Sequence, residues 1–152
     1  FVWSELECHT YPWGIHRPST VRLSEHCFDD GWVMHEMGHV LGFQHEHQRK
    51  DRDCYLEVDP SLLTNTAYEI SHYIDTSFPY NWTSVMHYRR GTDFRVRREF
   101  YENQRDQLGT YEELNEMDVI KLKYYYCGGP HYCTTHPDEC KRQEEFVKSL
   151  NC

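Results

Sequence analysis

Residues 35–46 decide the fold, and their sequence is His35-Glu36-Met37-Gly38-His39-Val40-Leu41-Gly42-Phe43-Gln44-His45-Glu46. Two histidines four positions apart lie one turn apart on a helix, so both imidazoles can reach one ion at the zinc–nitrogen distance of about 2.0–2.1 Å. Gly42 can take a backbone conformation that other residues avoid, which lets the chain leave the helix and return His45 toward the same point. The stretch therefore predicts a zinc site with three nitrogen ligands, His35, His39 and His45.

Three protein ligands leave one position of the ion open, which is typical of a catalytic rather than a structural zinc. A water in that position has its pKa lowered toward about 7. Glu36 follows the first histidine, and its side chain lies off the ligand direction but still near the ion. We therefore predict that Glu36 is the general base for this water and then passes the proton to the leaving amine.

The motif is expected to lie on a helix that begins near Asp29-Asp30, which offer an N-cap, and that stops at Gly42. On a helical wheel of about 100° per residue the two histidines fall nearly opposite an apolar arc. That arc consists of Val33, Met34, Met37, Val40 and Leu41. We expect the apolar arc to face the core and the histidines to line a cleft.

Other stretches give a coarser outline. Thr20 to Ser24 alternates in hydrophobicity and predicts a short strand. A second helix is predicted from Asn115 toward Tyr126, because Asn115 and Asp118 have the spacing of a capping box. Cys127-Gly128-Gly129-Pro130 marks a boundary, so we divide the chain into a domain at 1–127 and a tail or linker at 128–152.

Two further stretches carry a family resemblance. Glu46 and the following Arg49-Lys50-Asp51-Arg52-Asp53 come directly after the third histidine, and Ser84-Val85-Met86-His87-Tyr88 lies far downstream. Together with the histidine motif, these stretches resemble the astacin family of metzincin zinc metalloendopeptidases, over roughly residues 3–127. The resemblance implies an α+β, metzincin-like protease fold with a zinc helix and a C-terminal helix. It also implies that the catalytic domain is incomplete at its N-terminus, with part of the N-terminal sheet missing.

The same resemblance assigns roles to individual residues. It implies that His35, His39, His45 and Tyr88 bind zinc and that Glu36 is the catalytic acid/base. Met86 would be the Met-turn residue that packs beneath the metal. Tyr88 would also act in catalysis, by leaving the metal to hydrogen-bond the tetrahedral intermediate as negative charge develops.

The seven cysteines indicate a disulfide framework made in an oxidising compartment, and the sequon Asn81-Trp82-Thr83 fits that compartment. The family resemblance pairs Cys8 with Cys27 and places the partner of Cys127 upstream of Phe1. Cys54 is a candidate partner for a tail cysteine. The pairings of the three tail cysteines stay open: Cys133, Cys140 and Cys152.

The composition excludes other classes of protein. A net charge of −9 argues against a nucleic-acid partner, and no apolar run approaches the length of a membrane span. His47 is interpreted as a surface residue.

Together these observations predict a secreted, extracellular zinc metalloendopeptidase that hydrolyses protein or peptide substrates through metal-activated water. A cysteine-rich module downstream would be a further partner. The alternative is a catalytically impaired, zinc-retaining extracellular binding domain, impaired because of the N-terminal truncation.

Overall fold

The structure is a computed structural model, and it describes residues 1–3, 7–11, 20–28, 31–89, 91, 93–100, 107–109 and 113–150. Its first sheet has the strand order β1-β3-β2, from β1 (Val2–Trp3), β2 (His9–Tyr11) and β3 (Thr20–Leu23). β3 is parallel to β1 and antiparallel to β2. β3 forms where alternation in the sequence predicts a strand. The predicted cap Asp29-Asp30 lies outside the described residues.

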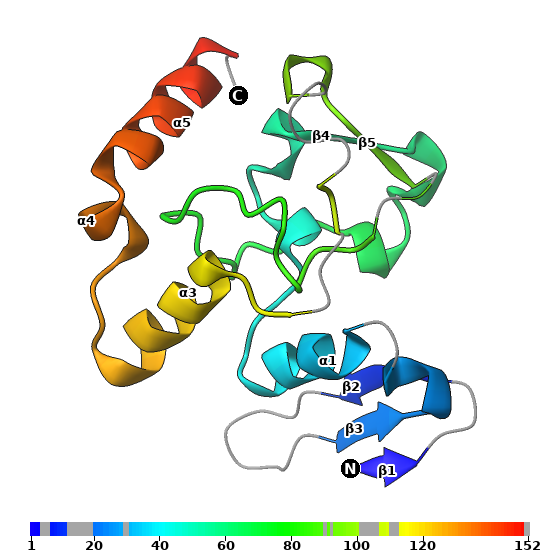
Figure 1. Cartoon of the computed structure of the whole chain (residues 1–152). Coiled ribbons are helices and arrows are strands. Elements are labelled where there is room, and N and C mark those ends of the chain that lie inside the picture. Colours follow the sequence, from blue (N-terminus) through cyan, green and yellow to red (C-terminus); the bar gives the residue numbers. More distant parts are fainter. Residues whose placement is uncertain are drawn as a thin grey trace.

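The helix α1 (Trp32–Val40) packs against β2 and β3 (Figure 1). It ends one residue before Leu41, and Gly42 follows with φ 84°. The prediction that the apolar arc faces the core is wrong for Met34, Val40 and Leu41, which are more than a third exposed. The other face, with His35 and Glu36, is the buried one, because residues 85–88 of a distant segment cover it.

The larger core is mostly aromatic. It gathers around β4 (Leu56–Val58) and β5 (Phe94–Val96), an antiparallel pair. Its buried members are Cys54, Tyr55, Leu56, Tyr68, Tyr80, Trp82, Phe94, Val96 and Leu108. Short 3-10 helices lie between and around these strands, at Glu46–Gln48, Arg52–Cys54, Pro60–Leu62, Thr66–Tyr68 and Arg98–Phe100, and another, Glu25–Phe28, lies between β3 and α1. Side-chain packing, more than regular secondary structure, therefore organises this half of the molecule.

The second helix begins where the capping box predicts. α3 (Glu116–Cys127) starts after Asn115, whose side chain accepts from the Asp118 N–H while the Asp118 carboxylate accepts from the Asn115 N–H. Gly128 ends it with φ 65°, a left-handed conformation that suits glycine. With helices and two small sheets in its described residues, the chain has the α+β fold class that the sequence predicts.

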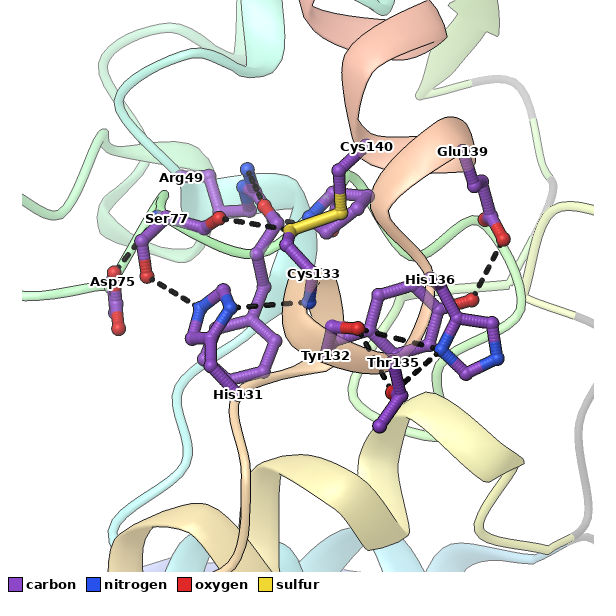
Figure 2. Close-up of a disulfide and its surroundings, with 12 residues drawn as sticks. Arg49, Asp75, Ser77, His131, Tyr132, Cys133, Thr135, His136, Glu139 and Cys140 are labelled. Carbon is purple, nitrogen blue, oxygen red and sulfur yellow. Dashed lines mark hydrogen bonds between the residues drawn. A yellow bond between two sulfur atoms is a disulfide. The ribbon is translucent and has the colours of Figure 1, made fainter.

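Two further helices, α4 (Tyr132–Thr135) and α5 (Pro137–Ser149), follow α3. A Cys133–Cys140 disulfide joins them (Figure 2). Tyr132 is buried against Phe78, and the Gln143 side chain of α5 donates to the Tyr55 hydroxyl. The tail is therefore in contact with the core, while the division at residue 127 stays a prediction.

The first disulfide joins Cys8 to Cys27 beside the first sheet. Cys54 is buried in the aromatic core, and its pairing with a tail cysteine stays a prediction because Cys152 lies outside the described residues. Cys127 is exposed and makes no disulfide to any residue that the structure describes. Within the same residues, no helix has the length and hydrophobicity needed to cross a membrane.

Candidate metal centre

The three predicted histidines meet at one point. α1 supplies His35 and His39 from successive turns, and the chain returns His45 after Gly42. The Nε2 atom of His45 lies 3.1 Å from that of His35 and 3.1 Å from that of His39. Their ligand atoms all lie within 4.8 Å of one another, so a single ion can bind all three.

The hydrogen bonds at the other ring nitrogen show which atom of each imidazole faces this point. Nδ1 of His35 donates to the Val85 carbonyl, and Nδ1 of His39 donates to the Phe43 carbonyl. Nδ1 of His45 donates to Oε1 of Gln48. The Gln48 oxygen is the acceptor here because the amide nitrogen of Gln48 donates to the Thr66 carbonyl. A neutral ring with its proton on Nδ1 has only a lone pair on Nε2. Three lone pairs at this separation repel one another, and a bound cation removes the repulsion.

Burial keeps these rings neutral. It lowers the pKa of His35 to about 4, aided by the nearby His39, and that of His45 to about 3, aided by His39 and His35. Burial also lowers the pKa of His39. Neutral imidazole nitrogens are what zinc prefers, so the donor set fits that metal.

Glu36 lies beside the histidines in a buried position. Its side chain is 2% exposed, and Oε2 has no hydrogen-bond partner in the described part of the chain. Its main chain is fixed, because the Thr10 hydroxyl of β2 donates to the Glu36 carbonyl. An unpartnered buried carboxylate oxygen is costly, and such atoms often mark a place where a ligand or water binds.

Met86 is packed against the zinc-site helix at Gly38. A Cβ atom placed on Gly38 would come within 2.3 Å of the Met86 sulfur. Only glycine therefore lets α1 approach the methionine this closely. Gly38 is a functional position to which the sequence motif assigns no role, although a glycine inside a helix is a signal of close approach.

Tyr88 stands next to the third histidine, with its ring centroid 4.5 Å from that of His45. Its side chain is half-buried, and burial raises its pKa, assisted by the negative charge of Glu36. Its main chain is held by His87, whose Nδ1 donates to the Tyr88 carbonyl, while the Tyr80 hydroxyl donates to Nε2 of the same ring. Gly109 packs against this carbonyl so closely that a Cβ would lie 2.3 Å from it.

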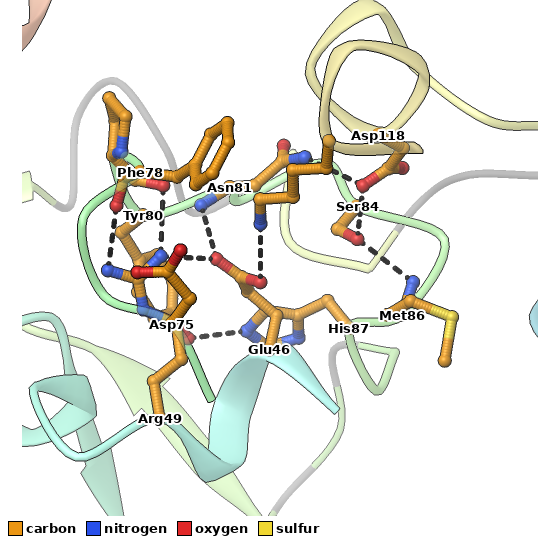
Figure 3. A network of polar contacts seen from close by, with 12 residues as sticks. Glu46, Arg49, Asp75, Phe78, Tyr80, Asn81, Ser84, Met86, His87 and Asp118 are labelled. Carbon is orange, nitrogen blue, oxygen red and sulfur yellow. Dashed lines mark hydrogen bonds and ion pairs between the residues drawn. The ribbon is translucent and has the colours of Figure 1, made fainter. Parts of the chain in front are cut away.

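A buried network joined to Glu46 ties these parts together (Figure 3). The Glu46 carboxylate pairs with Arg49 at 2.8 Å and with Lys121 of α3 at 3.1 Å, and it accepts from the Asn81 N–H. Burial alone would raise its pKa, but Lys121 and Arg49 outweigh burial and lower it to about 2. The Glu46 N–H donates to the Met86 carbonyl. The residue after the third histidine is thus bonded to both the Met86 turn and α3.

Asn81, the first residue of the sequon, belongs to the same interior. It is 4% exposed, and its amide donates to Asn115 and Asp118. In the folded chain this amide is therefore a structural donor and is closed to glycosylation.

The interpretation of His47 as a surface residue is wrong. His47 is fully buried, and its Nε2 donates to the Ala67 carbonyl. Its ring lies 5.1 Å from that of His45 and 4.1 Å from that of Tyr88. Nothing in its local sequence shows this, because its contacts other than that with His45 come from segments 20 and 41 residues downstream.

Zinc metalloproteases form the class in which one helix and the turn after it supply three such imidazoles, and the geometry of this chain places it there. Within that class, the chain belongs to the astacin family of peptidases, whose model matches residues 7–127.

Relatives in other organisms agree with this assignment. Zinc metalloproteinase nas-39 of Caenorhabditis elegans is 34% identical over 130 residues, which cover 74% of this chain and 14% of that protein. For zinc metalloproteinase nas-14 of the same organism the identity is 34% over 135 residues, 80% of this chain and 26% of the relative. The chain thus spans about a quarter or less of these two relatives.

A solved structure shows the same fold. High choriolytic enzyme 1, a hatching enzyme zinc-protease from the medaka Oryzias latipes, superposes with a TM-score of 0.53 at 26% identity. The match covers 64% of this chain and 52% of that chain.

Proposed function

We propose that this chain carries the active site of a secreted zinc endopeptidase that hydrolyses peptide bonds in extracellular proteins or peptides. The observation that carries the proposal is the convergence of three neutral imidazoles beside the buried, unpartnered Glu36 oxygen. A purely structural zinc needs no such carboxylate, because its coordination is closed by protein ligands. Membership of a family of zinc metalloproteinases supports the same activity.

The proposal gives zinc to His35, His39 and His45, with Tyr88 as a further ligand. Zinc bound there would polarise the scissile carbonyl and make a water acidic enough to attack it near neutral pH. Glu36 accepts the proton of the attacking water as the new carbon–oxygen bond forms. It then delivers that proton to the amide nitrogen as the carbon–nitrogen bond breaks.

Tyr88 would act on the oxygen that becomes negative in the transition state. A tyrosine phenol is protonated near neutral pH, and burial raises the pKa of Tyr88 further. When no metal is bound, its hydroxyl is therefore a donor whose hydrogen bond an oxyanion can accept. A bond that forms only as charge develops lowers the activation barrier without tightening substrate binding. Met86 would contribute packing beneath the ligands and no chemistry.

Extracellular action is supported by the disulfides. The Cys8–Cys27 and Cys133–Cys140 bonds persist in oxidising compartments and are rare in the cytosol.

The deciding experiment measures zinc content and cleavage of an unfolded protein substrate, with and without a chelator, on the purified chain. One zinc per chain with cleavage that a chelator abolishes and added zinc restores is the expected result. Zinc binding without cleavage leads to the same assay on a version extended upstream. A version that also fails to cleave would overturn the proposal in favour of a zinc-retaining binding domain.

A further inference from the structure

His47 is buried and titratable, yet the proposed mechanism does not use it. It lies in the short 3-10 helix Glu46–Gln48, two residues after the third histidine. Because the Ala67 carbonyl can only accept, the proton of this ring is on Nε2, which lies 3.0 Å from that oxygen. Nδ1 has no partner among the described residues. The ring is therefore held by one hydrogen bond and by packing.

The packing encloses the ring on several sides. Phe94 and His45 stack on it with centroids at 5.7 Å and 5.1 Å, and Tyr68 and His87 lie at 5.8 Å. All of these neighbours except His45 are buried, so the imidazole has little freedom to rotate. The His47 imidazole is therefore held in a fixed orientation between the aromatic core and the metal site.

The ring of Tyr88 rests on the His47 imidazole. The two centroids are 4.1 Å apart with an interplanar angle of 36°, closer than Tyr88 comes to His45 or Tyr68. His87 and Gly109 fix the main chain of Tyr88, but they leave its side-chain torsion free. In the part of the chain that the structure describes, no hydrogen bond to the Tyr88 hydroxyl is formed. Among the rings around Tyr88 in the described residues, the ring of His47 is therefore the nearest one that could set the direction of the phenol.

We propose that His47 is a positioning residue for Tyr88: its imidazole, anchored on the Ala67 carbonyl, sets the orientation of the phenol beside the metal-binding histidines. This inference rests on the proposed function for its effect on turnover, but the positioning itself does not require metal. A histidine suits the place because it combines a flat face for Tyr88 with an N–H for the buried carbonyl. Phenylalanine supplies only the face, and glutamine only the N–H.

The first test observes the position of Tyr88 directly in metal-free protein. A fluorinated tyrosine placed only at residue 88 reports its surroundings by its ¹⁹F chemical shift. His47→Gln is expected to move the resonance toward the value of an exposed tyrosine, while His47→Phe keeps it near the wild-type value with a lowered melting temperature. Tyr55→Leu is the matched control, since it damages the same core while its ring contacts are with Tyr80, Trp82 and Phe100. An unchanged resonance in folded His47→Gln would overturn the proposal.

The second test is a double-mutant cycle in turnover. His47→Gln is expected to lower kcat about tenfold, the lower end for residues that orient a metal site, with little change in KM. In a Tyr88→Phe background the same substitution should have almost no further effect on kcat, because the group that it positions is gone.

An equal loss of kcat in both backgrounds would mean that His47 acts without Tyr88 and would refute the inference. If wild-type protein binds zinc but does not cleave, the proposed function fails while the fluorine experiment still decides the positioning. The two failures are therefore distinguishable.

Discussion

One wall of the metal site is the regular helix α1, whereas the opposite wall, residues 78–88, contains no helix or strand. α1 places its histidines by backbone hydrogen bonds and a fixed period. The other wall is held by side chains, and all of its residues except Thr83 and Tyr88 are buried. Its polar groups bond to Glu46, Asp118 and Asn115, which come from two other elements. Side-chain networks can therefore fix atoms as firmly as secondary structure, provided that every buried polar group has a partner.

The largest expected effect tests the helix wall. Glu36→Gln should retain one zinc per chain and an unchanged melting temperature, while peptide hydrolysis falls about 10²–10⁴-fold because the base is lost. Metal analysis, calorimetry and kinetics on the same preparation measure all three. Glu57→Gln, on the exposed face of β4, is the matched control and should behave as wild type. Turnover that survives in Glu36→Gln would remove Glu36 from the mechanism.

The next largest effect tests the wall formed by residues 78–88, through the buried network around Glu46. Lys121→Met leaves the buried Glu46 carboxylate with Arg49 as its one remaining ion pair among the described residues, and breaking a buried pair costs about 3 kcal/mol of unfolding free energy. Denaturant titration measures the loss. Lys123→Met, two residues along the same helix but exposed, should change little. Equal losses in the two variants would show that the ion pair contributes nothing of its own.

Low pH should lower the free energy of unfolding that the same Glu46 network contributes. The pKa of Glu46 falls from an ordinary 4.5 to about 2 in the folded chain, and this lowered pKa contributes about 3 kcal/mol of stability. Because the folded pKa is the lower one, the contribution is complete above pH 4.5 and is lost as the pH falls toward 2. Denaturant titrations from pH 6 to 2 should show this loss in wild type and a smaller one in Glu46→Gln. Identical pH profiles would contradict the assignment.

A smaller effect arises where the two walls touch. Gly38→Ala introduces a Cβ that overlaps the Met86 sulfur, and overpacking of this kind costs about 1–3 kcal/mol. Adding Met86→Ala to Gly38→Ala should recover part of the loss, because the truncated side chain makes room. Gly91→Ala is the control, since its Cβ would meet nothing within 4 Å. Additive losses in the double variant would disprove the contact.

The smallest effect concerns the helix cap that supports the network. Asn115→Ala removes the acceptor for the Asp118 N–H, a loss of about 1 kcal/mol for an N-cap. Asn65→Ala removes a similar cap at an exposed position, before the 3-10 helix Thr66–Tyr68, and should cost less. Thermal unfolding of both variants compares them. A larger loss for Asn65→Ala would indicate that the Asn115 cap is not part of a buried network.

The two walls also differ in how far the sequence predicts them. The period of four between His35 and His39, the glycine after the helix and the capping box of α3 are local patterns, and the structure has all three. The cationic partners of Glu46 come from 3 and 75 residues away, and no local pattern shows that the more distant one will meet it.

The errors have the same cause. The interpretation of His47 as a surface residue fails because its neighbours in space are aromatic rings from distant segments. The hydrophobic pattern predicts that the apolar arc of α1 faces the core, but the segment that covers α1 packs on the histidine face instead. Amphipathicity predicts the buried face of a helix only when the polar face has no partner of its own.

The link between Glu46 and Lys121 has a consequence for the order of folding. A carboxylate cannot enter the interior at low cost before its cations arrive, and one of the two is 75 residues downstream. During synthesis, the histidine motif therefore emerges from the ribosome well before the segment that lets its neighbour become buried. Since contacts of such long sequence separation form slowly, nascent chains should pass through a stage in which the helix exists but the metal site is still open to solvent.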